Sequence, residues 1–367
     1  MCLQARTVKR FRSALCPEGD RGTAMVSAAA AADLSRNERN RCCGIRSRRW
    51  ATFCVLVHLA MTGVVVAESR SIRFDNGDVY EGEVDDDRRT GRGVYVWANG
   101  NRYEGEFANN TMHGQGRYSW KDGRVYTGAF VLDKREGSGE LVWPNGDRYR
   151  GTFRGNQING EGTFHWGNGD LYTGAFSNGE RTGQGSFSWA GGNSYTGDFR
   201  RNVPHGNGTF MWADGRRYTG TFANGLKAGA GRFEWPNGNR YEGEFRNDSR
   251  EGIGRFFWRD DTVYQGQFSS NRMHGYGVKI RPDGARELQR WEQGVLRDSI
   301  AVTPNERCRL LIRGEAWIFT NNHCINGLAH GKGLAVHPSG DRIIVDGRFV
   351  LGNLIEGEVF SLRPQRG

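Results

Sequence analysis

Paired carboxylates are the commonest residues of this sequence that could do acid–base chemistry. Glutamates recur two residues apart, at Glu81/Glu83, Glu104/Glu106 and Glu242/Glu244. Two carboxylates act as acid and base only when a pocket raises the pKa of one of them. A two-residue spacing puts both on one face of a β-strand, where burial is slight. We therefore expect a solvated strand surface rather than a catalytic pair.

Histidines are the second candidate, because they bind metals and transfer protons near neutral pH. His113, His205 and His274 each precede a Gly-x-Gly, as does His330. The first three are separated by 92 and 69 residues, which are multiples of 23. In a repeat protein such spacings place them far apart, so we expect a role in turns rather than a shared metal site.

One local motif resembles an enzyme segment. The run Trp317-Ile-Phe-Thr-Asn-Asn-His323-Cys324 is similar to the part of chymotrypsin-like proteases that carries the catalytic histidine, the general base for a serine. However, no Gly-[Asp/Ser]-Ser-Gly-Gly is present, and only 43 residues follow Cys324. A zinc site from Cys308, His323, Cys324 and His330 is the other option, but no Cys-x-x-Cys spacing supports it. P-loop, dinucleotide and His-Glu-x-x-His motifs are absent. We predict no catalytic, cofactor-binding or metal-binding residue, and hence no enzyme.

A 23-residue repeat determines where these residues lie. Each unit opens with Tyr-x-Gly-x-[Phe/Val], followed in register by Gly-x-Gly and Trp. The repeated tyrosines are Tyr80, Tyr103, Tyr126, Tyr149, Tyr172, Tyr195, Tyr218, Tyr241 and Tyr264. The repeated tryptophans are Trp97, Trp120, Trp143, Trp166, Trp189, Trp212, Trp235 and Trp258. We expect these residues to be structural.

Each unit predicts a β-hairpin. In the first strand Tyr103, Gly105 and Phe107 share one face, and the intervening polar residues take the other. The second strand repeats this alternation, the segment Ala108–His113 is expected to be a loop, and Lys121-Asp-Gly123 a turn. One face is therefore aromatic with glycine and the other polar. We expect the glycines to lie beside or under neighbouring rings.

Stacked hairpins predict an all-β fold: an elongated, single-layer solenoid of antiparallel hairpins forming a curved ribbon. Single hairpins are marginal in water, so each unit depends on its neighbours. Eighteen strands at about 4.8 Å spacing would span on the order of 85 Å. Ile72 and Phe74 form half a unit at the start, and Arg281 and Glu287 replace Trp and Tyr at the end. We interpret these atypical ends as capping units.

The run Tyr103-Glu-Gly-Glu-Phe-Ala-Asn-Asn-Thr-Met-His-Gly-Gln-Gly116, with its 23-residue recurrence, resembles the MORN repeat family. The resemblance covers about residues 72–297, in nine copies in register. It implies an elongated single-layer β-hairpin solenoid. It also implies scaffolding, dimerisation and phospholipid binding as the kinds of function to expect.

Composition excludes other classes. The chain has 55 glycines among 367 residues but only 8 prolines, and 12% aromatic residues. Collagen needs more proline, disordered chains have fewer aromatic residues, and interior glycines destabilise helices. The net charge of +10 arises mostly in residues 1–67, which hold 11 Lys/Arg and 4 Asp/Glu. The remainder has 40 and 37, so we predict no nucleic-acid binding.

Residues 1–67 form a basic leader with an apolar segment. The basic run 41–49 precedes Trp50–Ala67, which has no formal charge and ends in small residues. This order is typical of a secretory signal cleaved before Glu68, and we predict an exported protein in the periplasm or another extracytoplasmic compartment. A membrane anchor at 50–67 and an organelle transit peptide are the alternatives. Translation could also start at Met25.

The predicted domains are the leader 1–67, the array 68–297 and a C-terminal cap 298–367. Cys308 and Cys324 are the only cysteines after the leader, compatible with one disulfide or with two buried thiols. His330-Gly-Lys-Gly333 and Ser339-Gly340-Asp341 indicate a diverged repeat with a two-residue insertion before Phe349.

The function expected is a non-catalytic scaffold that mediates protein–protein contacts, exported or membrane-associated. The alternative is a peripheral membrane module that binds acidic phospholipids, through clusters such as Arg246–Arg250. The rows of Trp and Tyr predict either a homodimer or a ribbon that curls over its own face, because such a patch is too large to leave exposed. The protein partners themselves are not specified.

Overall fold

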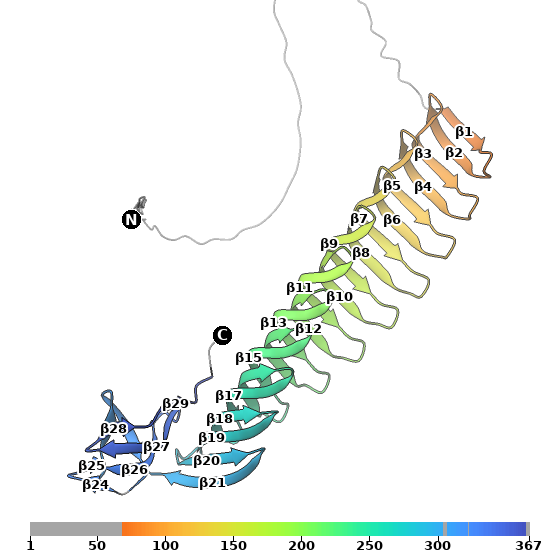
Figure 1. Cartoon of the computed structure of the whole chain (residues 1–367). Helices are drawn as coiled ribbons and strands as arrows, with labels where there is room; N and C mark the ends of the chain where they lie inside the picture. Colours follow the sequence, from red (N-terminus) through yellow and green to blue (C-terminus); the bar gives the residue numbers. More distant parts are fainter. Residues whose placement is uncertain (1–67, 304–306, 322, 365–367) are drawn as a thin grey trace, which may run out of the picture. The chain divides into compact units, whose positions relative to one another are not determined.

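A computed structural model of the chain describes residues 68–303, 307–321 and 323–364. All regular elements in these ranges are β-strands. Consecutive strands β1–β21 pair into one 21-stranded sheet, and the C-terminal strands form smaller sheets (Figure 1). The described ranges hold no helix long and apolar enough to span a membrane. The predicted leader and its apolar segment 50–67 lie outside the described residues.

The strands of the large sheet, called the array below, are β1 (Glu68–Arg73), β2 (Val79–Asp85), β3 (Arg88–Val96), β4 (Arg102–Ala108), β5 (Thr111–Ser119), β6 (Val125–Val131), β7 (Lys134–Val142), β8 (Arg148–Arg154), β9 (Gln157–His165), β10 (Leu171–Ser177), β11 (Glu180–Ser188), β12 (Ser194–Arg200), β13 (Val203–Met211), β14 (Arg217–Ala223), β15 (Leu226–Glu234), β16 (Arg240–Arg246), β17 (Ser249–Phe257), β18 (Val263–Ser269), β19 (Arg272–Ile280), β20 (Arg286–Glu292) and β21 (Val295–Val302).

The hairpins are tighter than the sequence predicted. Between β4 and β5 only Asn109 and Asn110 form the turn, with φ of 47° and 67°, so most of the predicted loop Ala108–His113 is strand. Asn and Asp tolerate this left-handed conformation, and two such residues in succession match the twist of a two-residue hairpin. The prediction of a loop was wrong because a β-bulge absorbs the extra residues, between Gly105 and Glu106.

Side-chain acceptors bridge successive units along both edges of the array. At one edge, Oδ1 of Asn193 accepts the main-chain N–H of Ala213 at 3.0 Å, one unit further along. Equivalent bonds to the following unit come from Asp78, Asn101, Asp147, Asp170 and Asn239. At the other edge, turn residues accept from the preceding unit: Asn110, Asp133, Asn156, Asn202, Asp248 and Asn271. Each unit is thus hydrogen-bonded to its neighbours outside the ladder as well as within it.

The C-terminal strands, called the lobe below, are β22 (Leu310–Ile312), β23 (Glu315–Phe319), β24 (Cys324–Ile325), β25 (Leu328–Ala329), β26 (Gly331–Val336), β27 (Arg342–Val350), β28 (Asn353–Glu356) and β29 (Val359–Ser361). The hairpin of β26 and β27 pairs Gly331 with Phe349 and Gly333 with Gly347, the register of Gly114 with Phe130 and Gly116 with Gly128 in the array. A bulge between Gly333 and Ala335 takes up extra residues. The lobe therefore contains a modified array hairpin.

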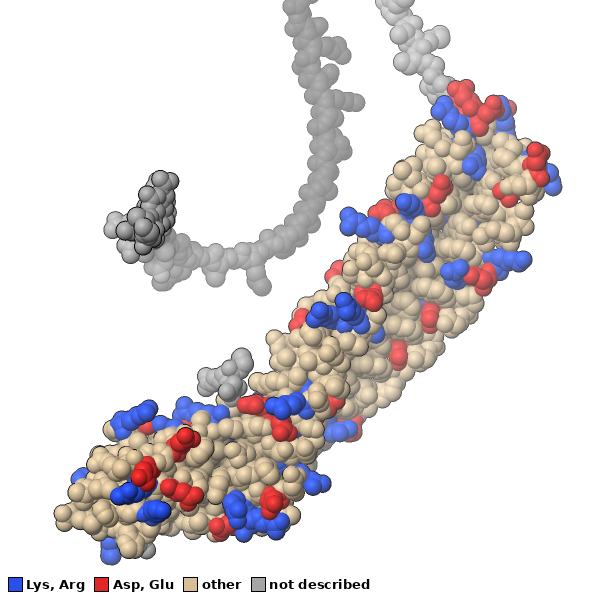
Figure 2. Space-filling model, viewed as in Figure 1, with Lys and Arg blue, Asp and Glu red and all other residues tan. Residues whose placement is uncertain are grey.

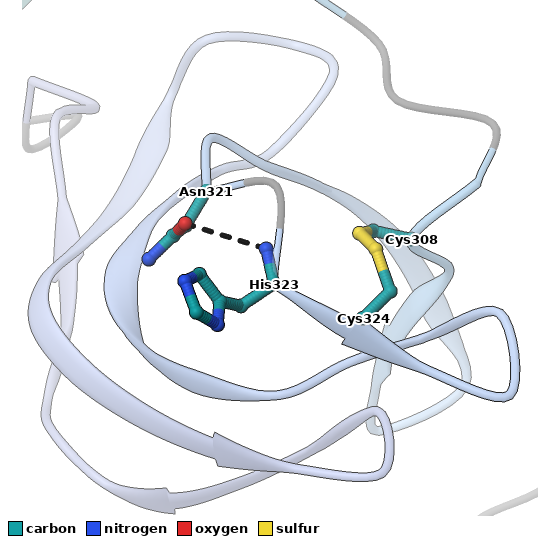
Figure 3. The surroundings of a disulfide bond; sticks show 4 residues. All are labelled: Cys308, Asn321, His323 and Cys324. Carbon is teal, nitrogen blue, oxygen red and sulfur yellow. Dashed lines mark hydrogen bonds between the residues drawn. A yellow bond between two sulfur atoms is a disulfide. The ribbon is translucent and has the colours of Figure 1, made fainter.

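A disulfide and an apolar core hold the lobe together. Cys308 and Cys324 are joined with their Cα atoms 5.3 Å apart, within the usual range for a disulfide (Figure 3). Cys308 packs in a cluster with Leu310, Trp317 and Phe349. A second cluster joins the lobe to the last array strands and contains Val278, Leu288, Val302, Ile318, Val336, Ile343 and Leu362.

Candidate interaction surface of the repeat array

A continuous row of glycines crosses the array. One glycine from each strand β2–β19 lies directly opposite the glycine of the next strand, from Gly82 paired with Gly93 to Gly266 paired with Gly277. A Cβ added at Gly151 would come within 2.6 Å of the Gly162 Cα atom and of the Glu161 carbonyl oxygen. Since real Cβ atoms do not approach backbone so closely, only glycine fits this row.

The repeated tyrosines cover the glycine row on the aromatic face. Tyr149 lies over Gly151 and Gly162, and its hydroxyl donates to the Thr152 carbonyl at 3.1 Å. Phe153 and Phe176 meet its ring edge-to-face, each with centroids 5.3 Å away. Burial raises the pKa of Tyr126, Tyr149 and Tyr172 to about 12. The expectation that glycines lie under rings is confirmed.

All nine repeated tyrosines are fully buried within one chain. Their burial does not itself require a second copy. The eight repeated tryptophans are partly buried and alternate with the Phe, Tyr or, at Leu141, Leu of the second strand, as in Trp166 against Phe187 at 5.2 Å. Both sets form the core of the array rather than a binding site.

The opposite face carries a row of side chains directly across from one another, called the polar row below. Its members, one from each strand β2–β20, are Glu81, Val94, Glu104, Arg117, Thr127, Glu140, Arg150, Thr163, Thr173, Ser186, Thr196, Thr209, Thr219, Arg232, Glu242, Arg255, Gln265, Val278 and Leu288. The sequence showed that this face is polar, but the alignment into one row depends on the bulged register.

The polar row changes character along the array. From β9 to β14 it has only hydroxyls, and pairs lie within hydrogen-bonding distance, as Thr209 and Thr219 do at 3.2 Å. Charged residues of both signs flank this stretch, with Glu140 near Arg150 on one side and Arg232 near Glu242 on the other. Figure 2 shows Lys/Arg and Asp/Glu interspersed over the visible surface of the molecule.

Two hollows open on the polar row. One, of about 540 Å³, is lined by Arg92, Glu104, Glu106, Gln115 and Arg117 with the intervening glycines. Here Glu106 accepts the main-chain N–H of Gln115 at 3.0 Å. The paired glutamates therefore lie on an open strand surface, and Glu106 has a structural role beside the bulge.

The second hollow, of about 900 Å³, lies where the lobe meets the array. It is lined by Arg232, Glu242 and Arg255 of the array and by Ser339, Asp341, Arg363 and Pro364 of the lobe. Beyond it the polar row turns apolar, and Val278 and Leu288 pack on Ile343 and Leu362 of the lobe. This change from polar to apolar is what allows the lobe to pack there.

The chain's own C-terminal segment lies on the polar row at this end. The Gln265 side-chain amide, which is 2% exposed, donates to the Leu362 carbonyl at 3.0 Å. Arg255 donates to the Gln265 Oε1 atom at 3.0 Å and so orients that amide. The polar row thus binds main-chain carbonyl oxygen of an extended segment at one position.

Cations on the aromatic face stack on rings. Arg135 lies 5.5 Å from the Trp120 ring and 5.6 Å from the Tyr126 ring, and it donates to the Asn156 carbonyl at 2.6 Å. Arg181 and Arg250 repeat this arrangement with Asn202 and Asn271. Burial lowers the pKa of all three arginines. Their guanidinium groups donate hydrogen bonds to main-chain carbonyls rather than to carboxylates.

The other residues that the sequence offered as candidates for chemistry do not form a site among the described residues. Cys308 and Cys324 are joined to each other, so neither is a zinc ligand, and the described ranges hold no cluster of three His, Cys, Asp or Glu that could bind a metal. His113, His205 and His274 lie in strands rather than in turns. The His323 main-chain N–H donates to Asn321 Oδ1 at 3.3 Å, within a local turn beside the disulfide (Figure 3).

A family model described as MORN repeat matches residues 80–102, 103–123, 126–148, 149–171, 172–194, 195–216, 218–240, 241–263, 264–286 and 325–342. The last match falls in the lobe and includes the start of the diverged hairpin.

No curated protein matches the sequence. Among solved structures, the SAS-4 (dCPAP) TCP domain in complex with a proline-rich motif of Ana2 (dSTIL) of Drosophila melanogaster is 18% identical, covers 42% of this chain and 84% of that chain, and has a TM-score of 0.27. Virginiamycin B lyase from Staphylococcus aureus is 12% identical, covers 80% and 84%, and has a TM-score of 0.13. Neither similarity is close enough to carry an argument about fold or function.

Proposed function

This chain belongs to the MORN repeat family, and we propose that it is a non-catalytic, exported scaffold whose polar row binds extended segments of partner proteins. MORN repeats are generally protein- or membrane-interaction modules. The observation that carries the proposal is the bond from Gln265 to the Leu362 carbonyl, in which the polar row already binds an extended segment. A row of many similar positions binds a partner through several weak contacts at once.

The hydroxyl stretch from β9 to β14 is the part of the polar row that we propose as the partner site. Hydroxyls both donate and accept, so they can pair with N–H and C=O groups of an extended chain. Desolvating them costs less than desolvating the ion pairs that flank them. Export is supported by the disulfide, since such bonds persist in oxidising compartments.

The test is a matched pair of variants in the native host. Thr173→Glu with Thr219→Glu places charge in the hydroxyl stretch, whereas Ser177→Glu with Ala223→Glu places the same charge at exposed ends of the same strands. We expect the first pair to abolish cross-linking to the partner protein and the second to retain it. Equal cross-linking by both, or none by the unmodified protein, would refute the proposal. N-terminal sequencing of the fractionated native protein tests export.

A second candidate function, binding of acidic phospholipid, is supported by the stacked arginines of the aromatic face. Arg135 and Arg181 have no carboxylate partner among the described residues and lie beside tryptophan, a combination suited to anionic headgroups. The test is co-sedimentation with phosphatidylserine vesicles. Arg135→Gln with Arg181→Gln should reduce salt-sensitive binding, and Arg154→Gln with Arg200→Gln at exposed strand ends is the control.

A further inference from the structure

The C-terminal segment enters the larger hollow through two neighbouring side chains. Leu362 is 1% exposed and packs with Val278, Leu288 and Ile343. Arg363 forms an ion pair with Asp341, which is also 1% exposed. The apolar residue is thus buried in an apolar cluster, and the arginine after it, whose side chain is 63% exposed, lies over a buried carboxylate.

Other lobe residues orient the buried carboxylate of Asp341 and supply it with hydrogen-bond and ion-pair partners. Its carboxylate accepts a hydrogen bond from the Ser339 hydroxyl, and His337 lies 3.4 Å from it. Arg342 lies 3.6 Å from the same carboxylate and also pairs with Glu315 at 2.6 Å. Burial alone would raise the pKa of Asp341, but the bonds from Ser339 and Arg363 lower it below its usual value. A buried carboxylate left without Arg363 would therefore strongly favour another guanidinium.

The main chain on either side of Leu362 is also bound. The Leu362 N–H donates to the Asp341 carbonyl at 2.7 Å, and its carbonyl accepts from Gln265. The site therefore contacts the backbone of Leu362 through two hydrogen bonds and the side chains of Leu362 and Arg363 through apolar packing and an ion pair. These are the features of a peptide site rather than of simple core packing.

The segment that fills the site is weakly attached elsewhere. β29 has three residues, all exposed, and pairs only with β27. Val359 and Phe360 are 44% and 43% exposed. Short exposed edge elements open at low free-energy cost. The unfilled hollow beside Arg363 gives a competing chain room to enter.

We propose that the Asp341 site is an exchangeable peptide-binding site whose ligand is an extended segment with an apolar residue followed by arginine. The chain's own Leu362–Arg363 fills it in the free protein. A partner segment of this chemistry displaces the tail and continues along the polar row, past Arg255 and Arg232. The inference rests on the proposed function only for that continuation. The Asp341 site itself is formed by residues of the array end and the lobe.

The experiment opens the site after folding. A protease site inserted after Gly357, between β28 and β29, is cut in the folded full chain, and the nicked tail is exchanged against a fluorescent synthetic peptide of residues 358–364. We expect the peptide to bind the nicked chain and to bind the uncut chain at least about 30-fold more weakly. A peptide with Arg363→Ala should bind about 10-fold more weakly than the native peptide, because only the carboxylate of this ion pair is buried and the Arg363 side chain is 63% exposed.

Matched variants separate the site from general stability. Asp341→Asn should reduce the difference between the two peptides, whereas Glu356→Gln, an exposed carboxylate paired with Arg348, should leave it unchanged. Full-length Arg363→Ala provides a second route, because its weakened tail should admit the native peptide without any cut. Equal binding of both peptides, or no binding to the nicked chain and to this variant, would overturn the inference. Either result leaves the Thr173/Thr219 test of the proposed function intact.

Discussion

The array and the lobe use related hairpins but stabilise them by different means. In the array, tyrosine rings lie over a glycine row, and units away from the lobe contact only the units next to them. In the lobe, the equivalent hairpin of β26 and β27 packs in a mixed aromatic and aliphatic core, and a disulfide joins Cys308 to Cys324 in the segments beside it. Phenylalanine rings lie against glycines in the lobe too, Phe319 against Gly333 and Phe349 against Gly347, so the ring-on-glycine contact is kept there without the stacked neighbours of the array. At the end of the array a closed core replaces them.

The largest expected difference between the two regions is their response to alkaline pH. Burial raises the pKa of Tyr126, Tyr149 and Tyr172 to about 12, against about 10 in an unfolded chain. The protonated phenols are favoured in the folded state, so their contribution to stability is complete below pH 10 and is lost as the pH rises toward 12. The lobe, residues 307–364, contains no tyrosine.

Between pH 10 and 12 we therefore expect the array to unfold first. Tyrosinate absorbance should rise together with the loss of β-sheet circular dichroism. If tyrosinate formed while the β-sheet signal persisted, the tyrosines would not be buried in the folded array and the prediction would be wrong.

Glycine substitution should affect the array more than the lobe. Gly151→Ala forces a Cβ against backbone at 2.6 Å and displaces Tyr149, so we expect a loss of about 4 kcal/mol from overpacking and a broken hydroxyl bond. Gly347→Ala in the lobe meets the side-chain ends of Ile344 and Phe349 at 2.7 Å, and about 1–2 kcal/mol is expected because these can move.

Urea unfolding of the purified variants measures both free energies. Gly191→Ala is the control within the array, since a Cβ there meets nothing within 4 Å. A cost for Gly151→Ala no larger than for Gly191→Ala would show that the glycine row is not required.

Removal of the disulfide should act on the lobe alone. The bond closes a short loop of sequence separation 16, and its loss is expected to cost about 3 kcal/mol. Cys308→Ser with Cys324→Ser should therefore lower the unfolding temperature of the lobe while the array transition stays in place. Tyrosine absorbance follows the array alone, because the lobe has no tyrosine, and circular dichroism follows both regions. Two alkylatable thiols in the oxidised native protein would exclude the bond.

The fold was predictable because one spacing fixes strand, turn and face together. The period of 23 placed Tyr103, Gly105 and Phe107 on one face, and the register confirms it. The polar row was not predictable, since its alignment depends on a bulge that shifts pairing between Gly105 and Glu106. The loop 108–113 was mispredicted for the same reason. Asp341 belonged to the diverged repeat, but its pairing with the Leu362–Arg363 segment carried no periodic signal, because that site forms only when distant segments pack.

A pattern that the sequence did contain explains the edge bonds. Six units place Asn or Asp where its side chain accepts the main-chain N–H of the next unit. Where the next unit has proline, at Pro144, Pro236 and Pro282, the preceding unit has Arg124, Arg216 and Thr262 instead. Proline has no N–H, so an acceptor there would have no donor. The residue types at positions 20 apart, an Asn or Asp before a residue with an N–H and another residue before proline, therefore indicate this contact from one sequence alone.

The smallest effect, and the most specific, is the loss of one such bond. Asn193→Ala removes the acceptor for the Ala213 N–H and should cost about 1 kcal/mol. Arg124→Asn should gain nothing from this bond, since Pro144 has no N–H to donate. Arg124→Asn combined with Pro144→Ala creates the missing pair, and a double-mutant cycle in urea should give a coupling of about 1 kcal/mol in favour of the double variant. The cycle cancels the separate effects of losing the Arg124 stack on Trp120 and the proline constraint. Zero coupling would mean that the edge bonds follow from the ladder and do not help to hold successive units together.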